Sequence, residues 1–163
     1  MRFNEGSTRR AVVAVGFSLL ALAPGTGWAQ SGESEEAAVR DVVVRLFDAM
    51  AARDTAAMAV LFAPDARFAG LGRDGVTYTT PQEFMAAVAS ATGPAWIERT
   101  YDYDIRIDGP LASVWTYYTL HVGDQFSHCG YDAFQMLRVG DAWQIVHLAD
   151  SRRKEGCTRT EGG

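Results

Sequence analysis

The sequence has no glycine-rich phosphate loop, no extended cluster of basic residues and no hydrophobic run long enough to span a membrane comfortably. Acidic residues outnumber basic ones by 20 to 15, which gives a formal net charge of −5. An acidic chain without a Lys/Arg cluster is a poor partner for nucleic acid or anionic lipid. Nucleotide binding would require a glycine-rich loop between a strand and a helix. We therefore expect no nucleic-acid partner and no cofactor.

Histidine is also scarce. The three histidines, His121, His128 and His147, are not spaced as a local chelate. Because a zinc site needs three or four converging ligands, the sequence predicts no metal site.

Residues 1–29 have the layout of a secretory signal peptide. Arg9 and Arg10 precede the apolar run 11–23, and Gly27-Trp28-Ala29 offers small residues for cleavage. The run is shorter than the roughly 20 residues that a membrane helix needs, although an uncleaved anchor is the alternative. We predict a periplasmic or secreted protein that has no membrane contact after cleavage. The Sec route is the expected one, and the paired arginines leave the twin-arginine route open.

Cleavage would change both the charge and the chemistry of the chain. The leader carries a net two positive charges, so its removal takes the formal charge from −5 to −7. Both cysteines, Cys129 and Cys157, lie in the remaining part, and an even number in an oxidising compartment favours a disulfide over two free thiols. Such a bridge would staple the C-terminal tail, residues 152–163, and stabilise the fold by about 3 to 4 kcal/mol.

Three helices are predicted in the first half of the mature chain. After a polar linker over residues 30–33, Ser34 is a candidate N-cap, and apolar residues then recur every three or four positions over 39–50. Asp54 caps a second, shorter helix that carries Met58, Leu61 and Phe62 on its inner face and ends at residues 63–65. Thr80-Pro81-Gln82-Glu83 is a capping box that opens the third helix.

Strands dominate the second half. Residues 66–70 and 76–79 flank a glycine-containing turn, and from Trp96 the apolar period changes to two. Four strands follow at 97–107, 111–122, 126–139 and 143–151, separated by short turns that predict an antiparallel meander. The fold class is therefore α+β, with three N-terminal helices packed on a curved antiparallel sheet.

The order of these elements carries a family resemblance. The segment 54–68 (DTAAMAVLFAPDARF) and the ending 143–148 (WQIVHL) after 133–137 (AFQML) resemble the nuclear-transport-factor-2-like superfamily, especially its polyketide cyclase (SnoaL-like) branch. The resemblance covers about residues 34–151, which implies one cone-shaped domain with a pocket at its wide end. Such folds also often imply a homodimer. The motifs concern packing and turns, so they imply a fold more than a function.

Hairpin register predicts which side chains share a face. With two-residue turns, Thr119 lies opposite His128, Trp115 opposite Asp132, and Phe134 opposite His147. One face then collects an aromatic set suited to a hydrophobic or aromatic small molecule, namely Tyr101, Tyr103, Trp115, Tyr117, His128 and Phe134. The other face, with Thr116, Gln135 and Gln144, would meet solvent. A slip of one residue in any hairpin would reverse that strand's assignment.

Asp132 and His147 are the candidate catalytic residues on this face. An aspartate in an apolar cavity has a raised pKa and can transfer a proton near neutral pH, with a histidine to orient it. Tyr101 and Tyr117 could donate hydrogen bonds to a developing oxyanion. The alternative is that Asp132 and His147 simply satisfy each other as a buried polar pair.

Three functions are open on this evidence. The leading one is an exported domain that binds a small molecule of unknown identity. The second is a cofactor-independent lyase or isomerase that uses the Asp/His pair. The third is a homodimeric accessory interaction domain.

Overall fold

The computed structural model describes residues 27–72 and 74–159. Nearly all of the predicted signal peptide therefore lies outside the described residues. The helices are α1 (Gly27–Ala52), α2 (Thr55–Ala59) and α3 (Pro81–Ser90), and the strands are β1 (Phe62–Gly72), β2 (Gly75–Thr79), β3 (Trp96–Asp108), β4 (Leu111–Val122), β5 (Gln125–Val139) and β6 (Ala142–Asp150). None of these described helices is both long enough and apolar enough to cross a membrane.

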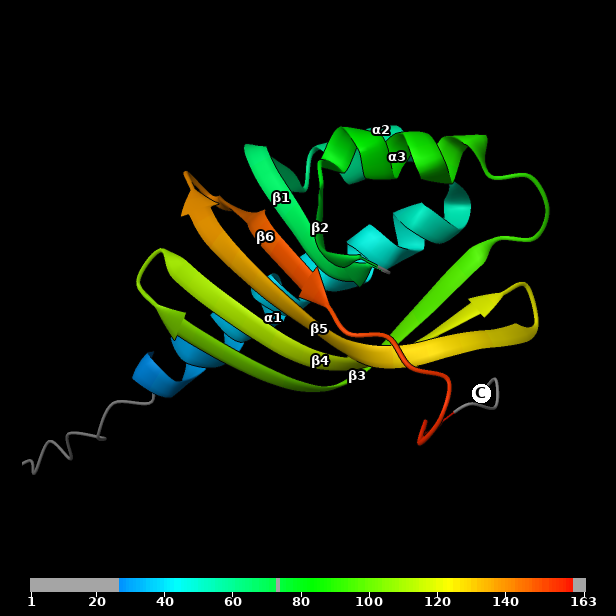
Figure 1. Ribbon diagram of the computed structural model, residues 1–163. Helices are drawn as coiled ribbons and strands as arrows, with labels where there is room; N and C mark the ends of the chain where they lie inside the picture. The colour runs from blue at the N-terminus through cyan, green and yellow to red at the C-terminus, as the bar shows by residue number, and fades with distance from the viewer. Residues whose placement is uncertain (1–26, 73, 160–163) are drawn as a thin grey trace, which may run out of the picture.

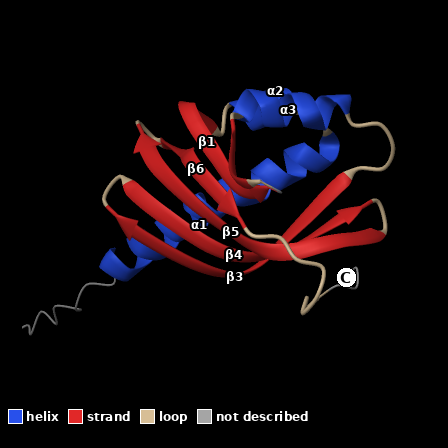
Figure 2. Cartoon of the chain, in the orientation of Figure 1, coloured by secondary structure: helices blue, strands red, loops and turns tan. Residues whose placement is uncertain are grey.

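The strands form one curved sheet in the order β2-β1-β6-β5-β4-β3. The β1/β2 hairpin and the β3–β6 meander are antiparallel, as predicted, whereas β1 lies parallel to β6 and joins the two parts. Figure 1 shows α1 running along the concave side of the sheet, with α2 and α3 at one end. Figure 2 shows the helices gathered on that same side. The predicted α+β fold class is confirmed.

The apolar stripe of α1 forms the centre of the core. Val39, Val43 and Leu46 are completely buried, and the Phe47 ring meets Phe134 of β5 edge to face with centroids 6.2 Å apart. The helix begins at Gly27, so the predicted linker 30–33 and the predicted N-cap Ser34 lie inside it. Adding residues to an existing helix requires no new nucleation, and no proline interrupts this stretch.

Local capping chemistry determines where α2 and α3 begin. The Asp54 side chain accepts a hydrogen bond from the Ala57 amide at 2.9 Å. The Thr80 and Glu83 side chains each accept a hydrogen bond from the other's backbone amide, which confirms the predicted capping box. The second helix is shorter than predicted, because the Leu61 carbonyl already accepts a hydrogen bond from the Ile145 amide of the sheet.

Irregular register in the meander changes which side chains share a face. His121 lies opposite Phe126 but Leu120 lies opposite His128, so Ser127 is an extra residue in β5. Val146 is an extra residue in β6 in the same way, between the pairs Met136/Ile145 and Gln135/His147. Each bulge shifts the register by one residue, which turns the rest of the strand over relative to its partner. The predicted pairs Thr119/His128, Trp115/Asp132 and Phe134/His147 are therefore wrong.

A third bulge divides the tyrosines of β3. Tyr101 lies opposite Tyr117, but Trp115 lies opposite Asp104 and not opposite Tyr103. Asp102 has a φ of 53° at this point, a left-handed conformation that accommodates the extra residue. Tyr101 and Tyr103 therefore occupy opposite faces of the sheet. Thr116, predicted to meet solvent, is completely buried on the concave side.

Candidate functional site

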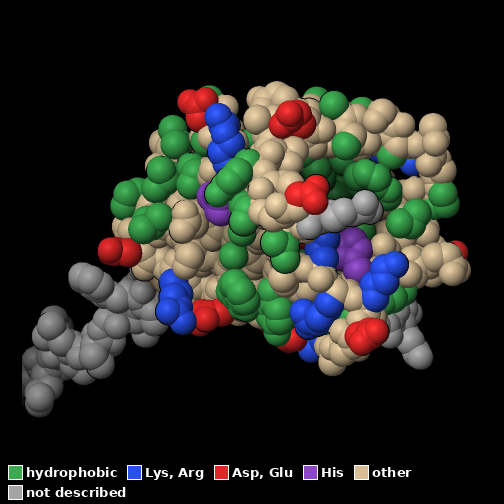
Figure 3. All heavy atoms as spheres, in the orientation of Figure 1, with side chains coloured by type: hydrophobic (Ala, Val, Ile, Leu, Met, Phe, Trp, Pro, Cys, Tyr) green, Lys and Arg blue, Asp and Glu red, His purple; other side chains and the backbone are tan. Residues whose placement is uncertain are grey.

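A cavity of about 430 Å³ opens between the concave face of the sheet, α1 and α3. This volume is in the range of small-molecule sites in proteins. The apolar part of its lining includes Phe47, Met50, Phe68, Phe84, Trp96, Leu120, Val122 and Leu148, and the polar part includes Glu98, Tyr118, His128, Asp132, Asp150 and Arg152. Figure 3 shows hydrophobic side chains around a hollow beneath α3, with basic and histidine side chains beside it.

Two carboxyl groups meet inside this cavity. Glu98 of β3 and Asp132 of β5 lie within reach of a shared proton, and each carboxyl group changes the pKa of the other. Asp132 is only 2% exposed. Two oxygen atoms of the pair, Glu98 Oε1 and Asp132 Oδ2, are buried and have no hydrogen-bond partner in the protein. No protein donor satisfies these two atoms, so a proton shared within the pair, a water molecule or a ligand must do so.

Burial makes this carboxyl pair a proton carrier near neutral pH. Burial, together with the nearby Asp150 carboxylate, raises the pKa of Asp132 to about 7, against the opposing effects of the Glu98 hydrogen bond and Arg152. Burial and the neighbouring Asp132 charge raise the pKa of Glu98 well above its ordinary value. A group with a pKa near the working pH can both donate and accept a proton.

A second polar group lies beside the pair. Asp150 of β6 is directly opposite Asp132, and its Oδ2 accepts a hydrogen bond from Arg152 Nε at 2.5 Å. The Tyr118 hydroxyl donates to the Ser151 carbonyl at 2.9 Å. Burial raises the pKa of Tyr118, so this phenol stays protonated and keeps its hydrogen bond to Ser151.

His128 completes this polar wall. Its Nδ1 lies 3.0 Å from the Ser127 hydroxyl, and its ring meets Tyr118 edge to face. Burial lowers the pKa of His128, and the Arg152 charge adds to this effect. The imidazole is therefore expected to be neutral at neutral pH.

Of the predicted site residues, Asp132 and His128 line the cavity. His147 does not, because the Val146 bulge places it opposite Gln135 and beside Arg67 of β1, on the face that points away from Asp132. The predicted Asp132/His147 pair is wrong, and Glu98 occupies the place expected for the histidine.

The other predicted ligand-binding residues have structural roles. Phe134 is 1% exposed and packs in the core. Tyr103 is partly buried against the core beneath the Arg40 guanidinium, with its hydroxyl bonded to Thr100. Tyr101, Trp115 and Tyr117 lie on the convex face, where Trp115 stacks on Tyr131 with centroids 5.2 Å apart.

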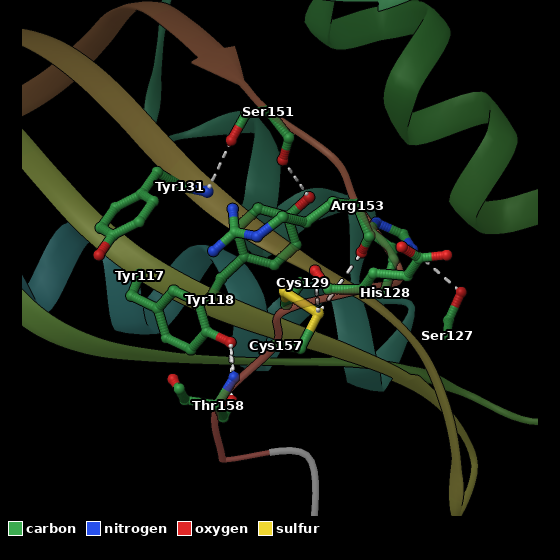
Figure 4. Close-up of a disulfide and its surroundings, with 11 residues drawn as sticks. Tyr117, Tyr118, Ser127, His128, Cys129, Tyr131, Ser151, Arg153, Cys157 and Thr158 are labelled. Carbon is green, nitrogen blue, oxygen red and sulfur yellow. Dashed lines mark hydrogen bonds between the residues drawn. A yellow bond between two sulfur atoms is a disulfide. The ribbon is translucent and has the colours of Figure 1, made fainter.

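The convex aromatic face holds the end of the chain. Residues 151–159, here called the C-terminal strap, leave β6 and cross this face, and the predicted Cys129–Cys157 disulfide is confirmed. Figure 4 shows the Tyr117 hydroxyl aimed at Thr158, with which it makes two hydrogen bonds of 2.7 and 2.8 Å. Arg159 pairs with Asp102 at 3.0 Å. The tyrosines that sequence reasoning assigned to a ligand therefore bind the protein's own tail.

Four residues of the polar wall are not among the site residues predicted from the sequence, namely Glu98, Tyr118, Asp150 and Arg152. A signal existed for two of them, because Asp150 and Arg152 are two positions apart in an extended segment and so share a face. No such signal existed for Glu98, because the sequence around Ile97 and Arg99 shows no clear alternation of apolar and polar residues. Within the described part of the chain, no group of three His, Cys, Asp or Glu side chains is arranged to hold a metal ion.

Residues 34–149 match the model of a protein family described as "Putative lumazine-binding". The chain belongs to this family. The match includes Glu98, Asp132 and His128, and it ends just before Asp150. No protein among the curated sequences matches the chain.

Solved structures confirm the predicted nuclear-transport-factor-2-like fold for this family member. A protein of unknown function from Mycobacterium tuberculosis is similar with a TM-score of 0.68 and 15% identity, covering 79% of this chain and 78% of that one. An NTF2-like protein of unknown function from Shewanella baltica has a TM-score of 0.63 and 18% identity, over 80% and 100% of the two chains. A "Putative Scytalone Dehydratase" from Novosphingobium aromaticivorans has a TM-score of 0.64 and 10% identity, over 77% and 88%.

These identities establish the fold of the family member and nothing finer. Assignment to the polyketide cyclase branch stays a prediction. The homodimer also stays a prediction, which light scattering can check.

Proposed function

We propose that this protein binds a small, largely apolar molecule in the cavity between the sheet, α1 and α3. The observation that carries the proposal is the composition of this cavity, in which aromatic and aliphatic side chains surround a few convergent polar groups. The description of the family supports the same class of function. Lumazine, the compound named in that description, is the first candidate to test.

The experiment uses the two tryptophans that lie on opposite faces of the sheet. Trp96 lines the cavity, whereas Trp115 is 52% exposed on the convex face. Native mass spectrometry of protein from its own cells would first look for a retained molecule. Titration of the emptied protein with that molecule, or with lumazine, is expected to change tryptophan fluorescence in wild type and in Trp115→Phe but not in Trp96→Phe. A protein that retains nothing and shows no change with lumazine would contradict the proposal.

The carboxyl pair favours a second candidate, a cofactor-independent lyase or isomerase. Asp132 and Glu98 supply a shared proton inside an apolar cavity, and such groups catalyse proton transfer to and from carbon or oxygen. The neighbouring fold described as a dehydratase is compatible with this chemistry. The predicted His147 has no part in it, because it lies on the other face.

Substitution separates binding from catalysis. If the pair transfers protons, Asp132→Asn and Glu98→Gln are expected to abolish turnover of the retained molecule even at saturating concentrations, with His147→Gln as the matched control. Full turnover in both carboxyl variants would exclude this second candidate.

We also propose that the protein works outside the cytoplasm. The N-terminal pattern of residues 1–29 supports the proposal, and so does the Cys129–Cys157 disulfide, because such bonds persist mainly in oxidising compartments.

A further inference from the structure

The polar wall of the cavity holds more carboxyl groups than basic side chains. Glu98, Asp132 and Asp150 all line it, from three different strands. The one basic side chain in the described lining is Arg152, which pairs with Asp150. The Arg152 side chain is 68% exposed, so water screens its charge. The described lining therefore offers the Glu98/Asp132 pair no buried cation, and a ligand that brings a positive charge would favour the ionised form of the pair.

The same pair holds two orphaned acceptors. Glu98 Oε1 and Asp132 Oδ2 are buried without a partner, and Asp132 is almost wholly inaccessible to solvent. Buried polar atoms that lack partners are costly, so the site favours a ligand that brings hydrogen-bond donors to these oxygens.

Another part of the cavity lining is aromatic. Phe68 and Phe84 pack with ring centroids 5.3 Å apart, and Trp96 lines the same cavity. Aromatic faces attract a cation and accommodate the flat apolar body of a ligand.

We propose that the ligand bound in this cavity carries a cationic nitrogen, a protonated amine or amidinium, that sits against Glu98 and Asp132 while its apolar body lies among the aromatic side chains. A neutral N–H group would satisfy the acceptors without stabilising the ionised pair, and an anionic group would oppose its ionisation. A cationic nitrogen satisfies both requirements. This inference rests on the proposed binding function and names the ligand class for the same site.

Three probes of one shape but different charge test the inference. Tryptamine, tryptophol and indoleacetate share an indole body and differ in a cationic, neutral or anionic head group. Isothermal titration calorimetry on the wild-type protein is expected to show tryptamine binding at least about tenfold more tightly than tryptophol, the preference expected of a charged hydrogen bond in a buried site, with indoleacetate weakest.

Variants assign this preference to the carboxyl pair. Asp132→Asn and Glu98→Gln, placed on two different strands, are each expected to reduce the ratio of tryptamine to tryptophol affinity towards one. Asp104→Asn removes a carboxylate from the exposed outer side of β3 and is expected to preserve the ratio. Circular dichroism checks that each variant is folded. If one of the two carboxyl variants does not fold, the other still tests the inference.

Three results would overturn the inference. Tryptophol or indoleacetate could bind wild type as tightly as tryptamine, which would leave the proposed small-molecule function intact while removing its cationic ligand. An unchanged ratio in both folded carboxyl variants would assign the preference elsewhere. No binding by any probe would overturn the inference too, and the retained molecule sought by native mass spectrometry would then decide the binding function separately.

Discussion

The Asp132 carboxyl is buried on β5, next to Glu98 and opposite Asp150. Burial raises its pKa from 3.8 to about 7 in the folded protein, so between these values the folded state holds a proton that the unfolded state has lost. The stabilisation from this proton is complete below about pH 4 and disappears as the pH rises through about 7. We expect the free energy of unfolding to fall over this window.

Asp132→Asn tests this pH dependence, because the amide cannot ionise. Urea denaturation at a series of pH values is expected to show a shallower decline for the variant than for wild type. The remaining slope reflects Glu98, whose pKa is also raised by burial. Asp104→Asn, an exposed carboxylate, serves as the control with an unchanged slope. Identical slopes for Asp132→Asn and wild type would show that Asp132 does not cause this pH dependence.

Gly130 occupies a point of close approach on β5. A Cβ added there would lie 1.7 Å from the Ser151 carbonyl oxygen and 2.8 Å from the Tyr118 ring. Because backbone cannot move aside cheaply, we expect Gly130→Ala to destabilise the protein by about 3 kcal/mol or more and to displace the C-terminal strap. Chemical denaturation would measure the loss. Gly32→Ala, where nothing lies within 4 Å, should show no such loss, and equal stability of the two variants would contradict the account.

At the scale of elements, the C-terminal strap is held by the sheet it crosses. The Arg153 amide and carbonyl pair with Cys129, and Tyr117 binds Thr158, but the covalent tie is Cys129–Cys157, which closes a loop of 28 residues. Loss of this tie is expected to cost about 3 to 4 kcal/mol in the chain-entropy model. Unfolding with and without reductant measures it in wild type. Cys157→Ser should be less stable by the same amount and indifferent to reductant, and a reductant effect that persists in the variant would point to another cause.

The bulges of β3, β5 and β6 determine which face each strand presents. The extra residue Ser127 places Tyr118 and Asp132 on the concave side, and the extra residue Val146 removes His147 from it. Because of these extra residues, carboxyl groups line the concave face, and Tyr101 and Tyr117 lie on the convex face.

At the scale of the whole molecule, export is the prediction with the clearest readout. Expression of the full chain in a bacterium is expected to give a periplasmic protein that begins at Gln30, detected by intact mass. Leu20→Arg, which places a charge in the apolar run 11–23, should keep the precursor in the cytoplasm. Replacing Arg9 and Arg10 together by lysine distinguishes the routes, since only twin-arginine export should fail. A periplasmic or cytoplasmic wild-type protein that keeps Met1 would refute cleavage.

The elements of the fold could be predicted from sequence because their causes are local. The apolar spacing from Val39 to Met50, the Thr80/Glu83 capping box and the two-residue turns each act within a few residues. The disulfide followed from cysteine count and compartment alone.

The residues of the site could not be predicted in this way. Which side chains reach the cavity depends on the pairing register, and each bulge changes that register for the rest of the strand. Asp132 and His128 were found, but Glu98, Tyr118 and Asp150 reach the cavity only because bulges, sheet curvature and the Gly130 gap bring β3, β5 and β6 together. Local residue chemistry thus determines that this chain forms helices, a meander and a bridge. Only the packed sheet decides which carboxyl group meets Asp132, since a shift of one residue turns every later side chain to the other face.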